Sequence, residues 1–199
     1  MLETGRAVCN FRRMSIMTGR GDEGATDLLF GRRIAKTALR MEALGAVDEL
    51  NSALGMARAA GPGEEITQVI DGVQSRLVGL MGQLACLPED MGRYAATGFV
   101  SMGEADVEWL VESAQAFEAR GVAFTGWARP GAEGSIARAA LDFARSVARR
   151  AERAILSLHE SGEEVPKEVR LFFNRVSDAM WIMARAEAGV SEGDAPAKA

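Results

Sequence analysis

The sequence predicts an all-α protein: an antiparallel bundle of five helices, preceded by an irregular glycine-rich segment. Apolar residues recur at intervals of three and four over five long segments. Glycine or proline ends most of these segments, and no stretch alternates apolar and polar residues as a half-buried strand would. The short connections favour antiparallel neighbours. We therefore expect one bundle over residues 14–190, an N-terminal extension over residues 1–13 and a flexible tail over residues 191–199.

The first two helices are predicted over residues 37–60 and 64–87. Gly61-Pro62-Gly63 ends the first helix, and Pro88 ends the second. The second helix carries three interior glycines, which lower its helix propensity and suggest that a neighbouring helix approaches closely. These glycines are Gly72, Gly79 and Gly82. The residues expected to face inward are Ala43, Val47, Leu50, Leu54 and Ala57, followed by Ile66, Val69, Ile70, Val73, Leu77, Leu80, Met81 and Leu84.

A third helix is predicted to follow a loop over residues 88–100. Ser101 and Glu104 have the spacing of a capping box, so this helix is expected to begin there and to continue to about Arg120. Residues 121–134 come next and contain four glycines and one proline. Long ordered loops of this kind often carry function. We therefore expect this loop to lie near a site.

The fourth and fifth helices, predicted over residues 135–160 and 166–189, are separated by a break at Gly162. On each helix, apolar residues follow one line at helical spacing, and polar or charged residues follow another. The apolar line should face the core of the bundle. Its members are Ile136, Ala140, Phe143, Val147, Ala154 and Leu158 on the fourth helix, and Val169, Phe172, Val176, Met180 and Met183 on the fifth.

The polar line of the fourth helix consists of arginines and a glutamate. Arg145, Arg149 and Glu152 lie at i, i+4 and i+7, within an arc of roughly 60°. Guanidinium groups are planar and always charged, which suits them to phosphate, carboxylate or a buried aspartate. The fifth helix repeats the pattern with Asn174, Asp178, Trp181 and Arg185. The two lines indicate a polar site or a subunit interface, and a solvated face with helix-pair salt bridges is the alternative.

A second candidate site is the glycine-rich segment from Thr18 to Thr26. Its three glycines would let backbone N–H groups approach an anion closely, while Arg20 adds a positive charge and the threonines add hydroxyls. The segment could therefore cradle a phosphate. It lacks the Gly-Lys-Ser/Thr ending of a Walker A loop, and an ordinary turn is the alternative.

The composition argues against several classes of function. The formal net charge is −5, which disfavours a broad nucleic-acid surface. No run approaches the ~18 apolar residues that a membrane span requires. Cys9 and Cys86 lie far apart and no secretory signal is recognisable, so we expect a cytoplasmic protein without a disulfide framework. Because His159 is the single histidine, a His-rich metal site and a Ser/His/Asp or Cys/His nucleophile are disfavoured, and any metal would be a hard ion held by carboxylates and ligand phosphates.

Taken together, these segments resemble the PduO-type ATP:cob(I)alamin (corrinoid) adenosyltransferases. The similar pieces, in order, are Thr18 to Thr26 with Gly21-Asp22-Glu23-Gly24 at its centre, Lys36, Arg40 to Ala43, Gly45 to Ser52, Arg145 to Arg153, and Phe173 to Asp178. The resemblance implies a five-helix bundle that forms a homotrimer, with ATP, Mg²⁺ and cobalamin bound at each subunit interface. It implies transfer of the 5′-deoxyadenosyl group of ATP to cob(I)alamin, which gives adenosylcobalamin and triphosphate. A reductase and an adenosylcobalamin-dependent enzyme are the implied partners.

The resemblance also implies roles for individual residues. The nucleotide loop would consist of Thr18, Gly19, Arg20, Gly21, Asp22, Gly24 and Thr26, with Lys36 and Arg40 as further phosphate or loop contacts. Arg149 and Glu152 would lie at the ATP and magnesium region, with Glu152 as a magnesium ligand, and Asn174 would contact the nucleotide. Asp48 and Arg145 would form a salt bridge across the subunit interface. Trp127 would be the aromatic residue that displaces the lower axial ligand of cobalamin.

Three positions depart from the family pattern. The family usually has threonine, glycine and phenylalanine where this chain has Arg20, Arg32 and Trp127. An alternative function is therefore a catalytically diverged homologue that binds corrinoid or nucleotide for delivery or sensing. A purely structural bundle is a third alternative, but it would leave both polar lines unexplained.

Overall fold

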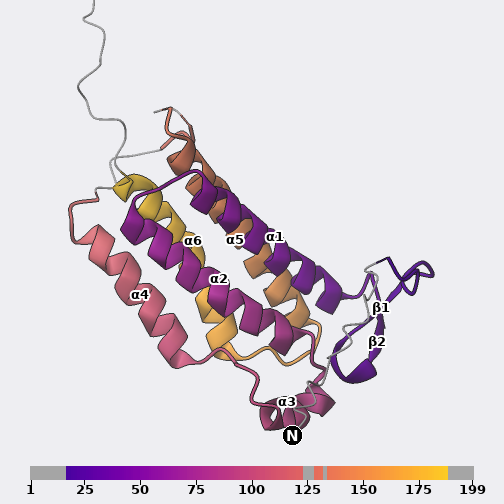
Figure 1. Cartoon of the computed structure of the whole chain (residues 1–199). Helices are drawn as coiled ribbons and strands as arrows, with labels where there is room; N and C mark the ends of the chain where they lie inside the picture. The colour runs from indigo at the N-terminus through magenta and orange to yellow at the C-terminus, as the bar shows by residue number, and fades with distance from the viewer. Residues whose placement is uncertain (1–16, 123–127, 132–133, 188–199) are drawn as a thin grey trace, which may run out of the picture.

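The computed structural model describes residues 17–122, 128–131 and 134–187. Within these ranges it forms an elongated helical bundle with a small hairpin at one end (Figure 1). The long helices, all of them predicted, are α1 (Leu39–Ala59), α2 (Glu64–Leu84), α4 (Glu104–Glu118), α5 (Ile136–Glu160) and α6 (Lys167–Ala186). Helix α1 packs against α2 and α5, α5 packs against α6, and α4 packs against α6 and α2. In the described ranges, every helix is too short or too polar to cross a membrane.

Two parts of the structure contradict the expected fold of five helices and no strand. A short helix α3 (Met91–Ala96), preceded by a 3-10 turn η2 (Pro88–Asp90), lies where we predicted a loop. The glycine-rich segment leads into an antiparallel pair, β1 (Ala25–Asp27) and β2 (Arg33–Ala35), joined by the 3-10 turn η1 (Leu29–Gly31). These elements are too short to produce a periodic pattern of apolar residues, and they were missed for that reason.

Helix α4 begins later than predicted, because its N-terminal cap is different from the one expected. The helix starts at Glu104, and Gly103 rather than Ser101 is the residue that precedes it. The backbone N–H of Gly103 donates to Asp106 Oδ2 at 2.9 Å, and the Asp106 N–H donates to the Gly103 carbonyl at 3.1 Å. Asp106 therefore fills the position that a capping box gives to an acidic side chain.

The core matches the prediction closely on α1 and α6 but not on α5. All five inward residues predicted on each of α1 and α6 are buried. On α5, Val147 and Leu158 are buried as expected, whereas Ile136 is 76% exposed and Phe143 is 50% exposed. The face of α5 that packs inward is built instead from Ala137, Leu141, Ala144, Val147, Ala148, Ala151, Ile155 and Leu158. The prediction was based on the large apolar residues of α5, whereas much of the face that packs against the bundle consists of alanines.

The interior glycines of α2 accommodate bulky neighbours, as their presence within a helix suggested. A Cβ atom added at Gly72 would lie 2.5 Å from the Trp109 ring of α4, which no real contact tolerates. At Gly82 the added atom would lie 3.1 Å from the Tyr94 hydroxyl of α3. The glycines of α2 therefore let an aromatic side chain lie directly on the helix backbone.

Candidate active site

The glycine-rich segment forms a compact turn in front of β1. Its N–H groups bond within the turn, from Asp22 to the Gly19 carbonyl at 3.1 Å and from Gly24 to the Gly21 carbonyl at 3.2 Å. Gly19 and Gly24 have φ angles of 67° and 81°, a region that favours glycine. Gly19 and Gly24 are thus required by the shape of the turn itself, whatever it binds.

Lys36 is held against this turn by both its backbone and its side chain. Its N–H donates to the Gly24 carbonyl at 2.8 Å. Its Nζ lies so close to Gly21 that an added Cβ there would be 2.8 Å away. The two residues are separated by 15 positions in the sequence, and the hairpin brings them together. The result is an ammonium group beside a glycine-rich turn, which suits an anion such as a phosphate.

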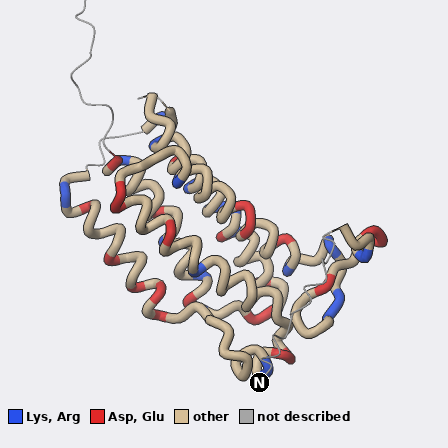
Figure 2. Tube along the Cα trace, in the orientation of Figure 1, with Lys and Arg blue, Asp and Glu red and all other residues tan. Residues whose placement is uncertain are grey.

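Arg20, which departs from the family pattern, is bonded to the hairpin. Its Nη2 lies 3.0 Å from Asp27 Oδ2, and its carbonyl accepts a bond of 2.6 Å from Arg33 Nη2. Arg33 Nη1 also lies 3.4 Å from Asp27 Oδ1. Figure 2 shows acidic and basic residues near one another on this hairpin. The pairing explains how the arginine is accommodated, and its exposed guanidinium keeps donors that Asp27 does not use.

The polar lines of α5 and α6 meet at Glu152. Asn174 Nδ2 donates to Glu152 Oε1 at 3.0 Å, and Asn174 Oδ1 accepts from Arg175 Nη1 at 2.5 Å. Arg149 lies one turn before Glu152 with an exposed side chain. An oriented carboxylate beside an arginine can bind a cation on one side and an anion on the other.

One carboxylate fits a magnesium ion that is held mainly by ligand phosphates. The described residues contain no group of three or more His, Cys, Asp or Glu side chains that could enclose a metal. Mg²⁺ commonly uses one or two carboxylates together with substrate phosphates and water. Glu152 keeps one oxygen that accepts no hydrogen bond from the described residues. The chemistry of this donor set therefore agrees with a phosphate-bound magnesium ion.

Within one chain, the structure does not join all the predicted site residues. Among the described residues, no hydrogen bond or ion pair links the glycine-rich turn and Lys36 to Arg149, Glu152 or Asn174. Asp48 and Arg145 are not paired either: Asp48 is exposed, and Arg145 Nε is buried without a hydrogen-bond partner. Instead, the neighbouring Glu49 pairs with Arg150 of α5. Arg145 lies on the α6 side of α5, as Glu152 does, whereas Arg150 faces α1.

Arg40 has a structural position that the sequence did not predict. It is only 3% exposed and its donors are used inside the fold. Its Nε donates to Glu163 Oε2 at 2.9 Å, and its Nη1 donates to the carbonyls of Leu84 and Cys86 at 2.8 and 3.1 Å. Arg40 thereby ties the start of α1 to the end of α2 and to the α5–α6 turn. Cys86 is a free thiol here, and burial raises its pKa.

The sequence predicted only one partner of a buried ion pair between α5 and α6. Arg185, predicted on the polar line of α6, donates to Asp142 Oδ1 at 2.7 Å, and both side chains are largely buried. The Arg185 guanidinium also lies 5.0 Å from the Trp181 ring centroid. This contact explains why a tryptophan lies on the polar line. Asp142 has no neighbour in the sequence that marks it as a buried partner, so sequence reasoning had no signal for it.

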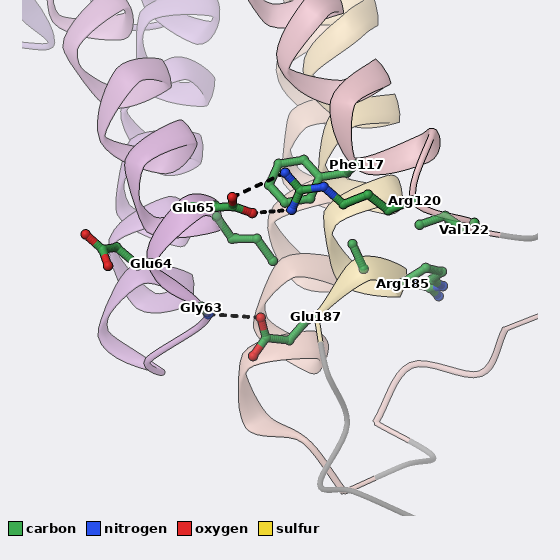
Figure 3. Close-up of a pocket in the computed structure, with 11 residues that line it drawn as sticks. Gly63, Glu64, Glu65, Phe117, Arg120, Val122, Arg185 and Glu187 are labelled. Carbon is green, nitrogen blue, oxygen red and sulfur yellow. Dashed lines mark hydrogen bonds and ion pairs between the residues drawn. The ribbon is translucent and has the colours of Figure 1, made fainter.

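A cavity of about 430 Å³ (Figure 3) lies at the end of the bundle opposite the hairpin (Figure 1). It is bounded by the start of α2 and the ends of α4 and α6. Arg120 pairs with Glu65 across it, and the Gly63 N–H donates to Glu187 Oε2 at 3.0 Å. None of the predicted ATP-binding residues lines it. Trp127, predicted to act on cobalamin, lies outside the described residues.

Comparison with known proteins agrees with the resemblance seen in the sequence. The family model described as cobalamin adenosyltransferase matches residues 16–187. The corrinoid adenosyltransferase PduO of Salmonella typhimurium is 33% identical over 177 residues, which cover 87% of this chain and 50% of that protein. The corrinoid adenosyltransferase of Bacillus subtilis is 34% identical over 186 residues, which cover 90% of this chain and 91% of that protein. The chain thus spans about half the length of the PduO relatives it matches and nearly all of other relatives.

The solved structures similar to this one extend the same likeness to the fold. A variant of the PduO-type ATP:corrinoid adenosyltransferase from Lactobacillus reuteri, complexed with cobalamin and ATP, aligns with a TM-score of 0.76 and 28% sequence identity. The alignment covers 86% of this chain and 92% of that one. Since the family model spans the whole described bundle and several relatives exceed 30% identity, this chain belongs to the cobalamin adenosyltransferase family.

Proposed function

We propose that this protein transfers the 5′-deoxyadenosyl group of ATP to the cobalt of cob(I)alamin. Co(I) attacks C5′ of ATP, so a cobalt–carbon bond forms while the C5′–O5′ bond breaks. The electron pair of that bond leaves with triphosphate, and the cobalt is formally oxidised from Co(I) to Co(III). Because the cobalt is the nucleophile, the protein needs no nucleophilic side chain. Its task is to align two substrates and to stabilise the charge that develops on triphosphate.

Two observations together support the proposal: the chain belongs to this family, and it retains two polar clusters that suit a nucleotide. The first cluster is the glycine-rich turn with Lys36, and the second is Arg149 with the Glu152–Asn174 pair. Both lie where the resemblance predicts nucleotide contacts. A similar structure is described as complexed with cobalamin and ATP, which supports the same two ligands here.

We assign a part in the reaction to each cluster. The N–H groups and hydroxyls around Thr18, Gly21 and Thr26, together with Lys36, bind the triphosphate. Arg149 stabilises the charge on the leaving group, and Glu152 holds Mg²⁺, which when bound neutralises phosphate charge. Asn174 orients the Glu152 carboxylate through its bond of 3.0 Å. Arg40 does not contact ATP in this proposal, because its side chain would have to break its bonds to Glu163, Leu84 and Cys86 to bind a phosphate.

We also propose that the active site is completed in a homotrimer. Among the residues that the structure describes, the two clusters are not bonded to each other within one chain, so an adjacent subunit can supply one of them. Asp48 is exposed, and the partly exposed Arg145 side chain makes no hydrogen bond or ion pair among the described residues, so the two can pair between subunits. Exposed Met56 and Phe143 provide apolar surface on α1 and α5. Sedimentation equilibrium should give a mass of three chains, and a monomer mass with full activity would contradict the shared site.

The activity is tested by mixing the purified protein with ATP, Mg²⁺ and chemically reduced cobalamin. The absorbance spectrum should convert to that of a light-sensitive alkylcobalamin, and triphosphate should appear in equal amount. Binding of cobalamin or ATP without conversion would favour the alternative of a delivery or sensing protein. This alternative is favoured by Arg20 and Trp127, because both residues depart from the family pattern.

A further inference from the structure

We propose that Arg32 and Asp90 are positioning residues for the nucleotide loop. Their ion pair, with the contact of Arg93 on Phe30, forms what we call the hairpin clasp. The clasp holds the turn between β1 and β2 against the 3-10 turn η2 and helix α3, and it thereby sets the position of the loop at the hairpin's other end. This inference rests on the proposed function, because it assumes that the loop binds ATP.

The turn of the hairpin has a backbone conformation that needs outside support. Phe30 has φ of 58° and ψ of 24°. Among the described residues, it is the only one other than glycine with a positive φ. A bulky L-residue is disfavoured in this region. Such conformations persist where surrounding contacts over-determine them. The turn therefore depends on what it packs against.

The outside support comes from the end of α2, η2 and α3. Arg32 Nε and Nη2 bind Asp90 Oδ2 and Oδ1 at 2.6 and 3.1 Å, which is a bidentate pair. The Arg93 guanidinium lies 4.2 Å from the Phe30 ring centroid. The Leu29 N–H donates to the Ala85 carbonyl at 3.0 Å. Three kinds of contact thus fix one short turn to the bundle.

The hairpin transmits this position to the nucleotide loop. Its register pairs Ala25 with Ala35, Thr26 with Ile34, and Asp27 with Arg33. Beyond the last strand pair, the Lys36 N–H donates to the Gly24 carbonyl, and the Lys36 Nζ lies against Gly21. A displacement of the turn must therefore displace Lys36 and the loop together. Binding of ATP by Lys36 and the loop is therefore expected to be sensitive to such displacement.

Another ion pair in the same chain provides a matched control. Arg58 Nε and Nη2 bind Asp71 Oδ1 and Oδ2 at 2.5 and 3.1 Å, so the geometry is nearly the same. That pair joins α1 to α2 near the other end of the bundle. The Asp71 side chain is 48% exposed, whereas that of Asp90 is 13% exposed. Loss of Arg58 removes a comparable ion pair without touching the hairpin.

The test compares Arg32→Ala with Arg58→Ala and with the charge swap Arg32→Asp combined with Asp90→Arg. We measure the ATP Kd by calorimetry, the KM for each substrate, and amide hydrogen exchange over residues 25–36. Arg32→Ala should raise the ATP Kd and KM about tenfold, speed exchange in the hairpin, and change kcat and the cobalamin KM by less than about twofold. Arg58→Ala should change none of these quantities. The swap should recover most of the lost ATP affinity.

Each outcome decides one question. An unchanged ATP Kd and unchanged exchange in Arg32→Ala would overturn the clasp, as would an equal loss of ATP affinity in Arg58→Ala. A swap that binds ATP no better than Arg32→Ala would also overturn it, because the pairing would not be the cause. ATP affinity is measured without cobalamin, so the clasp is tested separately from turnover. A wild-type protein that binds ATP but makes no adenosylcobalamin would refute only the proposed function.

Discussion

Individual charged residues in this protein differ in whether their donors and acceptors are already used inside the chain. Arg40 is buried and its donors are used by Glu163 and two carbonyls. Arg149, in contrast, is exposed and makes no side-chain bond among the described residues. The same residue type thus serves the fold in one case and is available to a ligand in the other. Sequence alone predicted a ligand contact for both.

Arg149→Ala should lower kcat by roughly 100-fold or more, because it removes a charge that stabilises the departing triphosphate. The variant should keep the wild-type unfolding free energy, since the side chain is exposed. Arg153→Ala is the control on the same helix. Within the described part of the chain its side chain donates only to the Arg149 carbonyl, at 3.0 Å, so kcat should stay within about twofold. Steady-state kinetics measures both variants. Equal losses in the two variants would remove the specific role of Arg149.

Arg40→Ala should destabilise the protein by about 2–4 kcal/mol, because it leaves Glu163 and two carbonyls without their donor. Urea unfolding followed by circular dichroism measures this loss. The ATP Kd of the folded variant should stay within about threefold of wild type. A large rise in Kd with wild-type stability would instead restore the ligand contact that the sequence suggested.

At the scale of elements, glycines and short segments decide how the helices and the hairpin fit together. Gly72 lets Trp109 of α4 lie on the backbone of α2, and the Arg76 guanidinium stacks on that ring, 3.6 Å from its centroid. The hairpin turn contacts η2 and α3, and α3 is itself anchored to α2 by its buried Tyr94, whose hydroxyl donates to the Gly79 and Val100 carbonyls. Ion pairs such as Arg58–Asp71 and Arg120–Glu65 join neighbouring helices from outside.

Gly72→Ala should destabilise the protein by about 1–3 kcal/mol, because the new methyl group would overlap the Trp109 ring and force it to move. Gly55→Ala is the matched control in α1. Its added Cβ would meet only Gln74 Nε2, at an ordinary 3.8 Å, so the better helix propensity of alanine should stabilise the protein by about 0.5–1 kcal/mol. Chemical denaturation measures both changes. Equal effects of the two substitutions would contradict the close approach of α4.

The exposed ion pairs predict how stability depends on acid. Hydrogen bonds from Arg58 and Arg120 lower the pKa of Asp71 and of Glu65 below their ordinary values in the folded protein. The unfolded chain therefore binds more protons in this range, and the unfolding free energy should fall as the pH drops from about 5 to about 3. In Arg58→Ala this fall should be smaller, since the pKa of Asp71 returns towards its ordinary value. A fall of equal size in both proteins would assign the acid sensitivity to other carboxylates.

At the scale of the whole molecule, the sequence predicted the long helices well and the face of one of them poorly. Buried lines on α1 and α6 follow a single apolar stripe, so periodicity was sufficient. On α5, exposed Phe143 and Ile136 drew the predicted stripe away from the alanines that pack inward. The stripe is ambiguous because α5 carries apolar residues on more than one side, and the exposed ones lie on the surface that we propose to pair in the trimer.

The sequence predicted which residues belong to the candidate site, but it did not predict how those residues contact one another. The two polar lines were expected to share one site, but the bond between Glu152 and Asn174 was not itself predicted. The contact of Lys36 with Gly21 could not be foreseen, because it depends on a hairpin of three-residue strands. The Arg185–Asp142 pair depends on burial that no local pattern of residues records.

The central claim is that a carbon of ATP becomes bonded to cobalt, and carbon labelling tests it most directly. The protein is incubated with reduced cobalamin, Mg²⁺ and ATP that carries ¹³C at C5′, and the products are examined by ¹³C and ³¹P NMR. We predict that the label appears in the carbon attached to cobalt and that one intact triphosphate is released for each adenosyl group transferred. Label that remains in ATP, or that appears in ADP or adenosine without a cobalt–carbon bond, would contradict the account.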